Sequence, residues 1–158
     1  MTALHIVGVG NPWRSDDSVG LQVIDALIAC GAGSDSVTLR KSDGDVADLI
    51  DVFQVSEEVV LVDAMNAGDE LTAGEVQVFD VSRDTVPAEQ LRTSTHALGV
   101  LEAIELARVL NCLPARVTVW GITGQCFEMG DALSAAVADA VQPVAARIRQ
   151  THVEPGDA

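Results

Sequence analysis

The chain has 158 residues and a mass of 16.5 kDa, a common size for a single compact domain. It carries 9 Lys and Arg against 24 Asp and Glu, and the formal net charge of −15 argues against a surface for nucleic acid or anionic lipid. Hydrophobic residues make up 48% and the mean hydropathy is +0.28, which excludes an intrinsically disordered chain.

Three cysteines, Cys30, Cys112 and Cys126, form no Cys-x-x-Cys pair, and their number is odd. This pattern supports neither a disulfide framework nor a structural zinc site. The first residues carry no basic leader, and no charge-free apolar run approaches the length that spans a bilayer. We therefore expect a soluble cytoplasmic protein with no membrane or nucleic-acid partner, and we expect a monomer.

The sequence begins with a strand, a loop and a helix. Leu4–Val9 is an unbroken apolar run, which is typical of a strand covered on both faces, and a Gly-Asn-Pro loop follows it. A helix is predicted to start near Asp17 or Ser18 and to end at Cys30, with Asp16 among the residues that cap its first amides.

The rest of the chain continues the alternation of short β-branched runs and helical patterns. Further strands are predicted at Val37–Lys41, Glu58–Asp63, Glu75–Val81 and Ala115–Ile122, and further helices at Asp45–Phe53, at Ala97–Asn111 and around Leu133 to Ile148. Because Glu75–Val81 alternates with a period of two, we expect an edge strand there, antiparallel to its neighbour.

These elements predict an α/β fold: a three-layer sandwich with a twisted, mostly parallel five-stranded sheet and helices on both faces. We expect one domain over residues 1–151. The remaining residues, 152–158, offer little to bury and are predicted to form a flexible tail.

Polar residues stand where the predicted strands end. Asp17 follows the first strand, Asp63 ends the third, and His96 opens the helix before the last strand. Ligands of an open parallel sheet collect at its carboxyl edge, so these side chains can converge there. Two carboxylates and an imidazole would make a three-ligand site for a divalent metal. Taken singly, each residue is also explained as a helix cap or strand end, and the pattern leaves both interpretations open.

Other catalytic motifs are absent or weak. Gly8-Val9-Gly10 lacks the third glycine of a dinucleotide fingerprint, because Trp13 stands at that position. The chain has no Walker loop and no Gly-x-Ser-x-Gly motif, which argues against nucleotide hydrolysis and α/β-hydrolase chemistry. Cys126 has no cationic partner nearby in the sequence, so we interpret it as an inert thiol.

Three separated blocks match a known protein family in order. They are Gly8-Val9-Gly10-Asn11-Pro12-Trp13-Arg14-Ser15-Asp16-Asp17, then Val62-Asp63-Ala64, then Ser94-Thr95-His96-Ala97-Leu98-Gly99. With these blocks the chain resembles the hydrogenase maturation endopeptidases, and the likeness covers nearly its whole length. The resemblance implies a twisted, mostly parallel sheet between helices.

The resemblance also implies an activity: removal of a C-terminal extension from the large-subunit precursor of nickel-iron hydrogenase once nickel has been loaded. The metal-contacting positions of the family correspond here to Asp17, Asp63 and His96, which we expect to contact the precursor's nickel and to be catalytic. The nickel would act as a Lewis acid or as a positioning device. Asp17 or Asp63 could alternatively serve as general base, and the sequence leaves these roles open.

The resemblance also concerns the contacts with the precursor. We expect Asn11 and Arg14, in the first loop, and Asp43 and Gly44, after the second strand, to touch the substrate. Ser18 stands where many relatives carry Gly, so a positive φ at that position would strain the loop.

Two other functions fit the same residues. A nickel-sensing escort would bind the precursor without cutting it, and a general α/β domain would bind an unrelated small ligand. Only the endopeptidase predicts a change in the mass of the large subunit.

Overall fold

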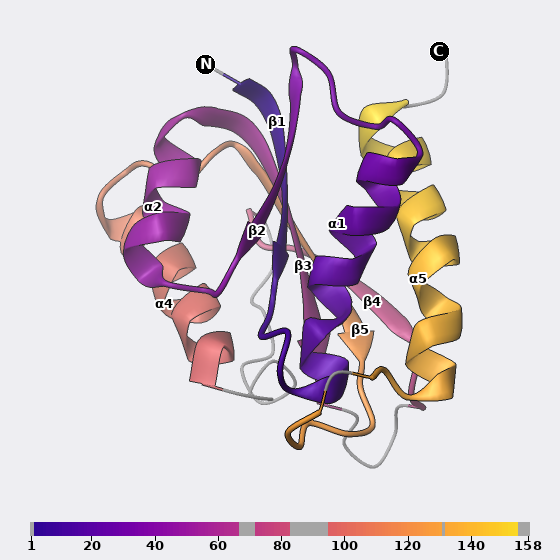
Figure 1. Ribbon diagram of the computed structural model, residues 1–158. Helices are drawn as coiled ribbons and strands as arrows, with labels where there is room; N and C mark the ends of the chain where they lie inside the picture. Colours follow the sequence, from indigo (N-terminus) through magenta and orange to yellow (C-terminus); the bar gives the residue numbers. More distant parts are fainter. Residues whose placement is uncertain (1, 67–71, 83–94, 131, 155–158) are drawn as a thin grey trace.

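The computed structural model describes residues 2–66, 72–82, 95–130 and 132–154, and its centre is a five-stranded sheet (Figure 1). The strands are β1 (Thr2–Val9), β2 (Val37–Ser42), β3 (Ser56–Met65), β4 (Val76–Asp80) and β5 (Arg116–Thr123). The helices are α1 (Val19–Ala29), α2 (Val46–Gln54), α4 (Thr95–Val109) and α5 (Ala135–Ile148). A 3-10 turn, η1 (Ser15–Ser18), precedes α1, and a π-helical turn, η2 (Arg149–Val153), follows α5.

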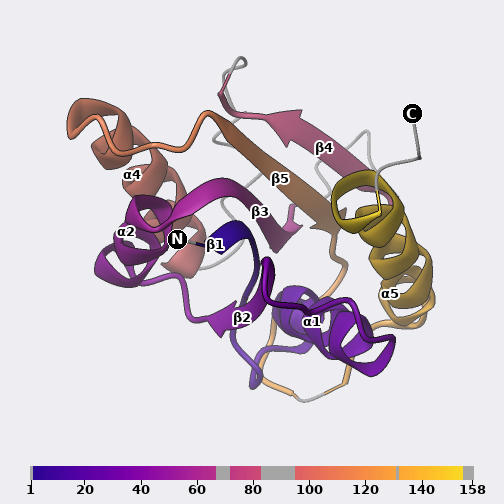
Figure 2. The ribbon, with the colours of Figure 1, turned by 90° about the horizontal axis from the view of Figure 1, so that it is seen from above.

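The sheet lies between two layers of helices, so the predicted α/β sandwich is confirmed. The strand order is β2-β1-β3-β5-β4, and β1, β2, β3 and β5 run parallel. Figure 2 shows α1 and α5 on one face of the sheet and α2 and α4 on the other. No helix in the described segments is both long and apolar enough to cross a membrane.

The fourth strand is the exception to the parallel order. β4 pairs antiparallel with β5 and stands at the end of the sheet, as its two-residue alternation predicts. Val76 contacts the core on the α5 side, whereas Phe79 packs on the other side.

The central strands are apolar on both faces because each face is covered. In β3, Val60 and Val62 pack into the core shared with α1 and α5, and the alternate residues Val59 and Leu61 pack into the core with α2 and α4. A strand buried in this way appears in the sequence as an unbroken apolar run.

Glycines let α1 lie directly on the sheet. A Cβ atom at Gly20 would stand 2.3 Å from the carbonyl oxygen of Val62 and 2.7 Å from that of Val9. A Cβ atom at Gly8 would stand 2.2 Å from the carbonyl oxygen of Gly20. The first turn of α1 therefore touches the ends of both β1 and β3, and it holds η1 beside them.

The C-terminal region is more ordered than its composition predicts. We expected a free tail from His152 onward, but the side chain of His152 is only 4% exposed. Its Nε2 accepts a hydrogen bond from Nε1 of Trp120 at 3.1 Å, and its Nδ1 lies 3.1 Å from Oε2 of Glu58. The expectation is wrong for His152 and Val153, which belong to η2; residues 155–158 lie outside the described residues.

The close approach of α1 to the sheet gives a stability prediction. Gly20→Ala should lower the free energy of unfolding by about 3 kcal/mol, because the new methyl group has no room beside two carbonyl oxygens. Urea denaturation measures the change. Gly33→Ala is the control, since its Cβ would meet only ordinary contacts of 3.6 to 3.8 Å. Equal stability of the two variants would contradict the packing described here.

Candidate functional site

Several loops meet at the carboxyl edge of the sheet, at the lower end of the molecule in Figure 1. The loop after β1 joins the end of β2 through a hydrogen bond from the backbone N–H of Gly10 to the carbonyl oxygen of Ser42. The loop after β5 joins the end of β3 through a hydrogen bond from the N–H of Gly124 to the carbonyl oxygen of Met65. This edge is where an open parallel sheet binds its ligands.

Asp63 lies near the end of β3 and is 1% exposed. Its Oδ1 accepts a hydrogen bond from the N–H of Ala64 at 2.8 Å. Because side chains alternate along a strand, Asp63 shares the face of Leu61, which is covered by α2 and α4.

Asp17 lies in η1 and is fully buried. Its backbone N–H donates to the carbonyl oxygen of Arg14 at 2.9 Å, and η1 contacts β3. Three residues further on, Gly20 rests on the carbonyl oxygen of Val62, the neighbour of Asp63. The segments that carry the two predicted carboxylates are therefore packed together.

His96 is the second residue of α4, and its side chain lies outside the described part of the chain. The backbone of this helix start is nevertheless placed. A Cβ atom at Gly99 would stand 2.2 Å from the carbonyl oxygen of Gly44, in the loop after β2, so α4 begins at the same edge of the sheet.

The structure thus brings the segments of Asp17, Asp63 and His96 to one edge, while a shared metal site stays a prediction. Among the residues with described side chains, no three His, Cys, Asp or Glu gather closely enough to hold an ion. The imidazole of His96 is not among these described side chains.

The buried carboxylate of Asp16 is a feature that the sequence did not reveal. Its Oδ2 accepts hydrogen bonds from the N–H groups of Gln125 and Cys126, both at 2.8 Å, and from Oγ of Ser134 at 2.7 Å. Its Oδ1 accepts the N–H of Ser134, also at 2.7 Å. Asp16 therefore ties η1 to the loop after β5 and to the residue that precedes α5.

This arrangement corrects the predicted role of Asp16 as a cap of α1. Ser18 occupies the cap position of that helix, and its side chain makes no capping hydrogen bond. Burial raises the pKa of the Asp16 carboxyl, but the hydrogen bonds from Ser134, Cys126 and Gln125 outweigh burial and hold the pKa below its ordinary value. The carboxylate is thus held in its charged form.

Backbone hydrogen bonds join the loop before η1 to the loop after β5. The N–H of Ser15 donates to the carbonyl oxygen of Gly130 at 2.7 Å, and the N–H of Gly130 donates to that of Trp13 at 2.8 Å. Positive φ occurs at Ser15, with a value of 46°, whereas Ser18 has a φ of −85°. The strain considered for Ser18 is therefore absent, and the unusual backbone lies three residues earlier.

The four residues expected to touch substrate lie in two of these loops. Asn11 accepts the N–H of Trp13 at its Oδ1, and Nε of Arg14 donates to the carbonyl oxygen of Phe127 at 3.1 Å. Asp43 is exposed, and Gly44 has a φ of 88°, a conformation that favours glycine. Their contacts with a precursor stay predictions.

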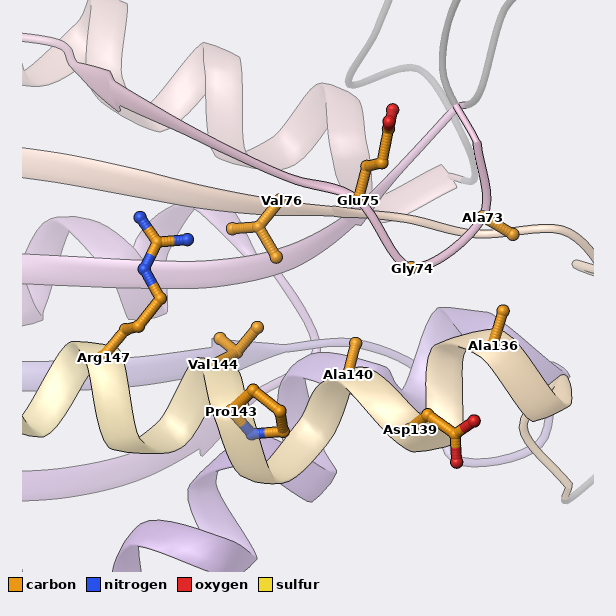
Figure 3. A pocket seen from close by; sticks show the side chains of 10 residues that line it. All are labelled: Ala73, Gly74, Glu75, Val76, Ala136, Asp139, Ala140, Pro143, Val144 and Arg147. Atoms are coloured by element: carbon orange, nitrogen blue, oxygen red, sulfur yellow. The ribbon is translucent and has the colours of Figure 1, made fainter.

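A separate cavity of about 430 Å³ lies between the start of β4 and α5. Figure 3 shows its apolar wall, which includes Val76, Ala140 and Val144, with Arg147 at one end. None of the predicted site residues lines it.

Comparisons with known proteins agree on one family. The model of the hydrogenase maturation protease family, HycI, matches residues 23–151, a range that includes Asp63 and His96 and begins after Asp17. No curated protein matches the chain.

Solved structures of this kind share the fold. The chain is similar to the hydrogenase maturating endopeptidase HybD from E. coli, with a TM-score of 0.76, 19% identity, and coverage of 96% of this chain and 94% of that one. It is also similar to the [NiFe] hydrogenase maturation protease HybD from Thermococcus kodakarensis, with a TM-score of 0.73, 23% identity, and coverage of 96% and 99%.

The hydrogen bonds of Asp16 predict a pH-dependent effect on stability. Asp16→Asn replaces one acceptor oxygen by a donor and should lower the free energy of unfolding by about 3 kcal/mol at neutral pH. The folded pKa lies below the unfolded value of about 3.9. The contribution of the charged carboxylate is therefore complete above that value and is lost as the pH falls through the folded pKa.

Urea denaturation at neutral pH and at about pH 3 tests this effect, and the gap between wild type and variant should narrow in acid. Asp35→Asn, at an exposed carboxylate, is the control and should change stability little. A gap that is absent at neutral pH, or that widens in acid, would show that Asp16 does not hold these loops.

Proposed function

Because the chain belongs to the hydrogenase maturation protease family, we propose that it removes the C-terminal extension of a nickel-loaded nickel-iron hydrogenase large-subunit precursor. In this proposal the nickel is part of the substrate, and Asp17, Asp63 and His96 contact it. The enzyme therefore distinguishes loaded from unloaded precursor by the metal itself.

One observation carries the proposal: three segments that are far apart in the sequence lie together at the carboxyl edge. η1 contacts β3, the strand that carries the buried Asp63, and α4, which begins with Thr95 and His96, starts beside Gly44. Two carboxylates and an imidazole suit a borderline divalent cation and leave positions for its ligands in the precursor.

The chemistry is the hydrolysis of one peptide bond. Water adds to the scissile carbonyl carbon, the C–N bond breaks, and a proton passes from the water to the leaving amine. In the alternative in which one of the two carboxylates does not bind nickel, Asp17 or Asp63 accepts that proton as general base. When bound by Asp17, Asp63 and His96, the precursor's nickel would supply Lewis-acid polarisation of the scissile carbonyl group or would position it for attack.

The loops around this edge provide contacts for the precursor on either side of the bond. Asn11 and Arg14 belong to a loop whose shape is held by hydrogen bonds at 2.9 and 3.1 Å. Asp43 and Gly44 belong to the loop on which α4 begins. A rigid rim of this kind reduces the entropy lost when the precursor binds.

The proposal is tested by incubating the purified protein with nickel-loaded precursor and measuring the mass of the large subunit. Wild type should shorten it, whereas Asp17→Asn, Asp63→Asn and His96→Ala should each slow cleavage by about 100-fold or more, because they remove contacts to the reacting group. Precursor without nickel should keep its mass.

Asp51→Asn, at an exposed carboxylate of α2, is the matched control and should cleave at the wild-type rate. Circular dichroism verifies that each variant keeps its fold. An unchanged mass with wild type, together with tight binding of the precursor, would identify a non-cleaving escort instead. Full cleavage by Asp63→Asn would contradict the assigned site.

A further inference from the structure

Two large apolar side chains are exposed on the loops beside the candidate site. Trp13 is 65% exposed and Met129 is 78% exposed. Trp13 precedes Asp17 by four residues, and the carbonyl oxygen of Arg14, between them, accepts the N–H of Asp17. An exposed tryptophan in this position is a feature to explain, because exposed apolar side chains that lie together often mark binding sites.

The backbone brings these two residues close to each other. Arg14 and Gly130 form a parallel β-bridge, and each of the two apolar residues directly precedes one member of that bridge. Trp13 and Met129 therefore lie at corresponding positions of the two paired loops. The hydrogen bond from the N–H of Gly130 to the carbonyl oxygen of Trp13 fits this register.

Side-chain hydrogen bonds hold the two loops together. Oγ of Ser15 donates to the carbonyl oxygen of Glu128 at 3.0 Å, and Nε of Arg14 donates to that of Phe127. The carboxylate of Asp16 binds the same loop through the N–H groups of Gln125 and Cys126. The pair is therefore presented on a rigid support, so binding a partner orders little additional chain.

We infer that Trp13 and Met129 form an apolar anchor that docks an apolar segment of the precursor next to the scissile bond; this inference rests on the proposed function. Tryptophan is enriched among the residues that dominate the free energy of binding at protein interfaces. Trp13 is four residues from Asp17 in the same loop and turn, and Met129 is in the loop bonded to it, so the anchor stands beside the segment that carries the carboxylate.

The size of the pair fits a substrate contact better than a second copy of the chain. Two such side chains supply roughly 300 Å² of contact area. A stable protein interface buries about 800 Å² on each partner. The anchor thus supplies part of a transient enzyme–substrate contact, and the metal and the rim loops supply the rest.

Steady-state cleavage of nickel-loaded precursor tests the anchor. Trp13→Ala and Met129→Ala should raise KM by about 10-fold or more and change kcat by less than about 2-fold, because they remove binding energy away from the reacting atoms. Trp13→Phe, which keeps an aromatic contact, should restore most of the affinity. Val109→Ala is the matched control: Val109 is 81% exposed but stands at the far end of α4, and its loss should leave KM unchanged.

A second measurement reports binding without catalysis. The chain has two tryptophans, so protein labelled with 5-fluorotryptophan gives two fluorine resonances, which Trp13→Phe assigns. Addition of precursor should shield Trp13 from a soluble paramagnetic relaxation agent and leave the buried Trp120 unaffected.

The outcomes separate the two ideas. If wild type cleaves and Trp13→Ala keeps the wild-type KM, the anchor is wrong and the proposed function stands. If wild type leaves the precursor intact, the proposed function is wrong, and shielding of Trp13 by the precursor still supports the anchor as a docking surface. Shielding of Trp13 that depends on protein concentration without precursor would show that a second copy occupies the surface, which overturns the inference.

Discussion

Four hydrogen bonds converge on the buried carboxylate of Asp16, and they connect η1, the loop after β5 and the residue before α5. Bonds from neutral donors to a charged acceptor are stronger than bonds between neutral groups, and here they outweigh the cost of burial, so the carboxylate stays ionised. The neighbouring residue is Asp17. The constraint that organises the loops therefore also sets the position of a predicted site residue.

A second constraint joins these loops to the sheet. Gly20 leaves no gap between α1 and the carbonyl oxygens of Val9 and Val62, so η1 sits against the ends of β1 and β3. The constraint at Asp16 consists of hydrogen bonds, whereas the constraint at Gly20 is steric. Together these constraints connect the loop and 3-10 turn that carry Trp13 and Asp17 to the strand that carries Asp63. The geometry of the candidate site depends on both.

The sheet and its helices were predictable because each depends on local patterns. A parallel strand covered on both faces gives an unbroken apolar run, and β4 gives the alternation of an edge strand. The strand-end rule likewise selects Asp17 and Asp63, both of which are buried, and their role as site residues stays a prediction.

The polar contacts of Asp16 and His152 were not predictable in the same way. The partners of Asp16 lie 109 to 118 residues further along the chain, and Glu58 lies 94 residues from His152. Local patterns carry no information about such pairs, so the sequence predicts a helix cap at Asp16 and a flexible tail that includes His152.

The central claim is that Asp17, Asp63 and His96 contact one divalent ion at the carboxyl edge of the sheet. Anomalous scattering from crystals soaked with nickel tests it most directly. We expect a single anomalous peak about 2.0 to 2.2 Å from a carboxylate oxygen of Asp17, from one of Asp63 and from an imidazole nitrogen of His96. A peak elsewhere on the protein, or an imidazole turned away from both carboxylates in the nickel-soaked crystal, would contradict it.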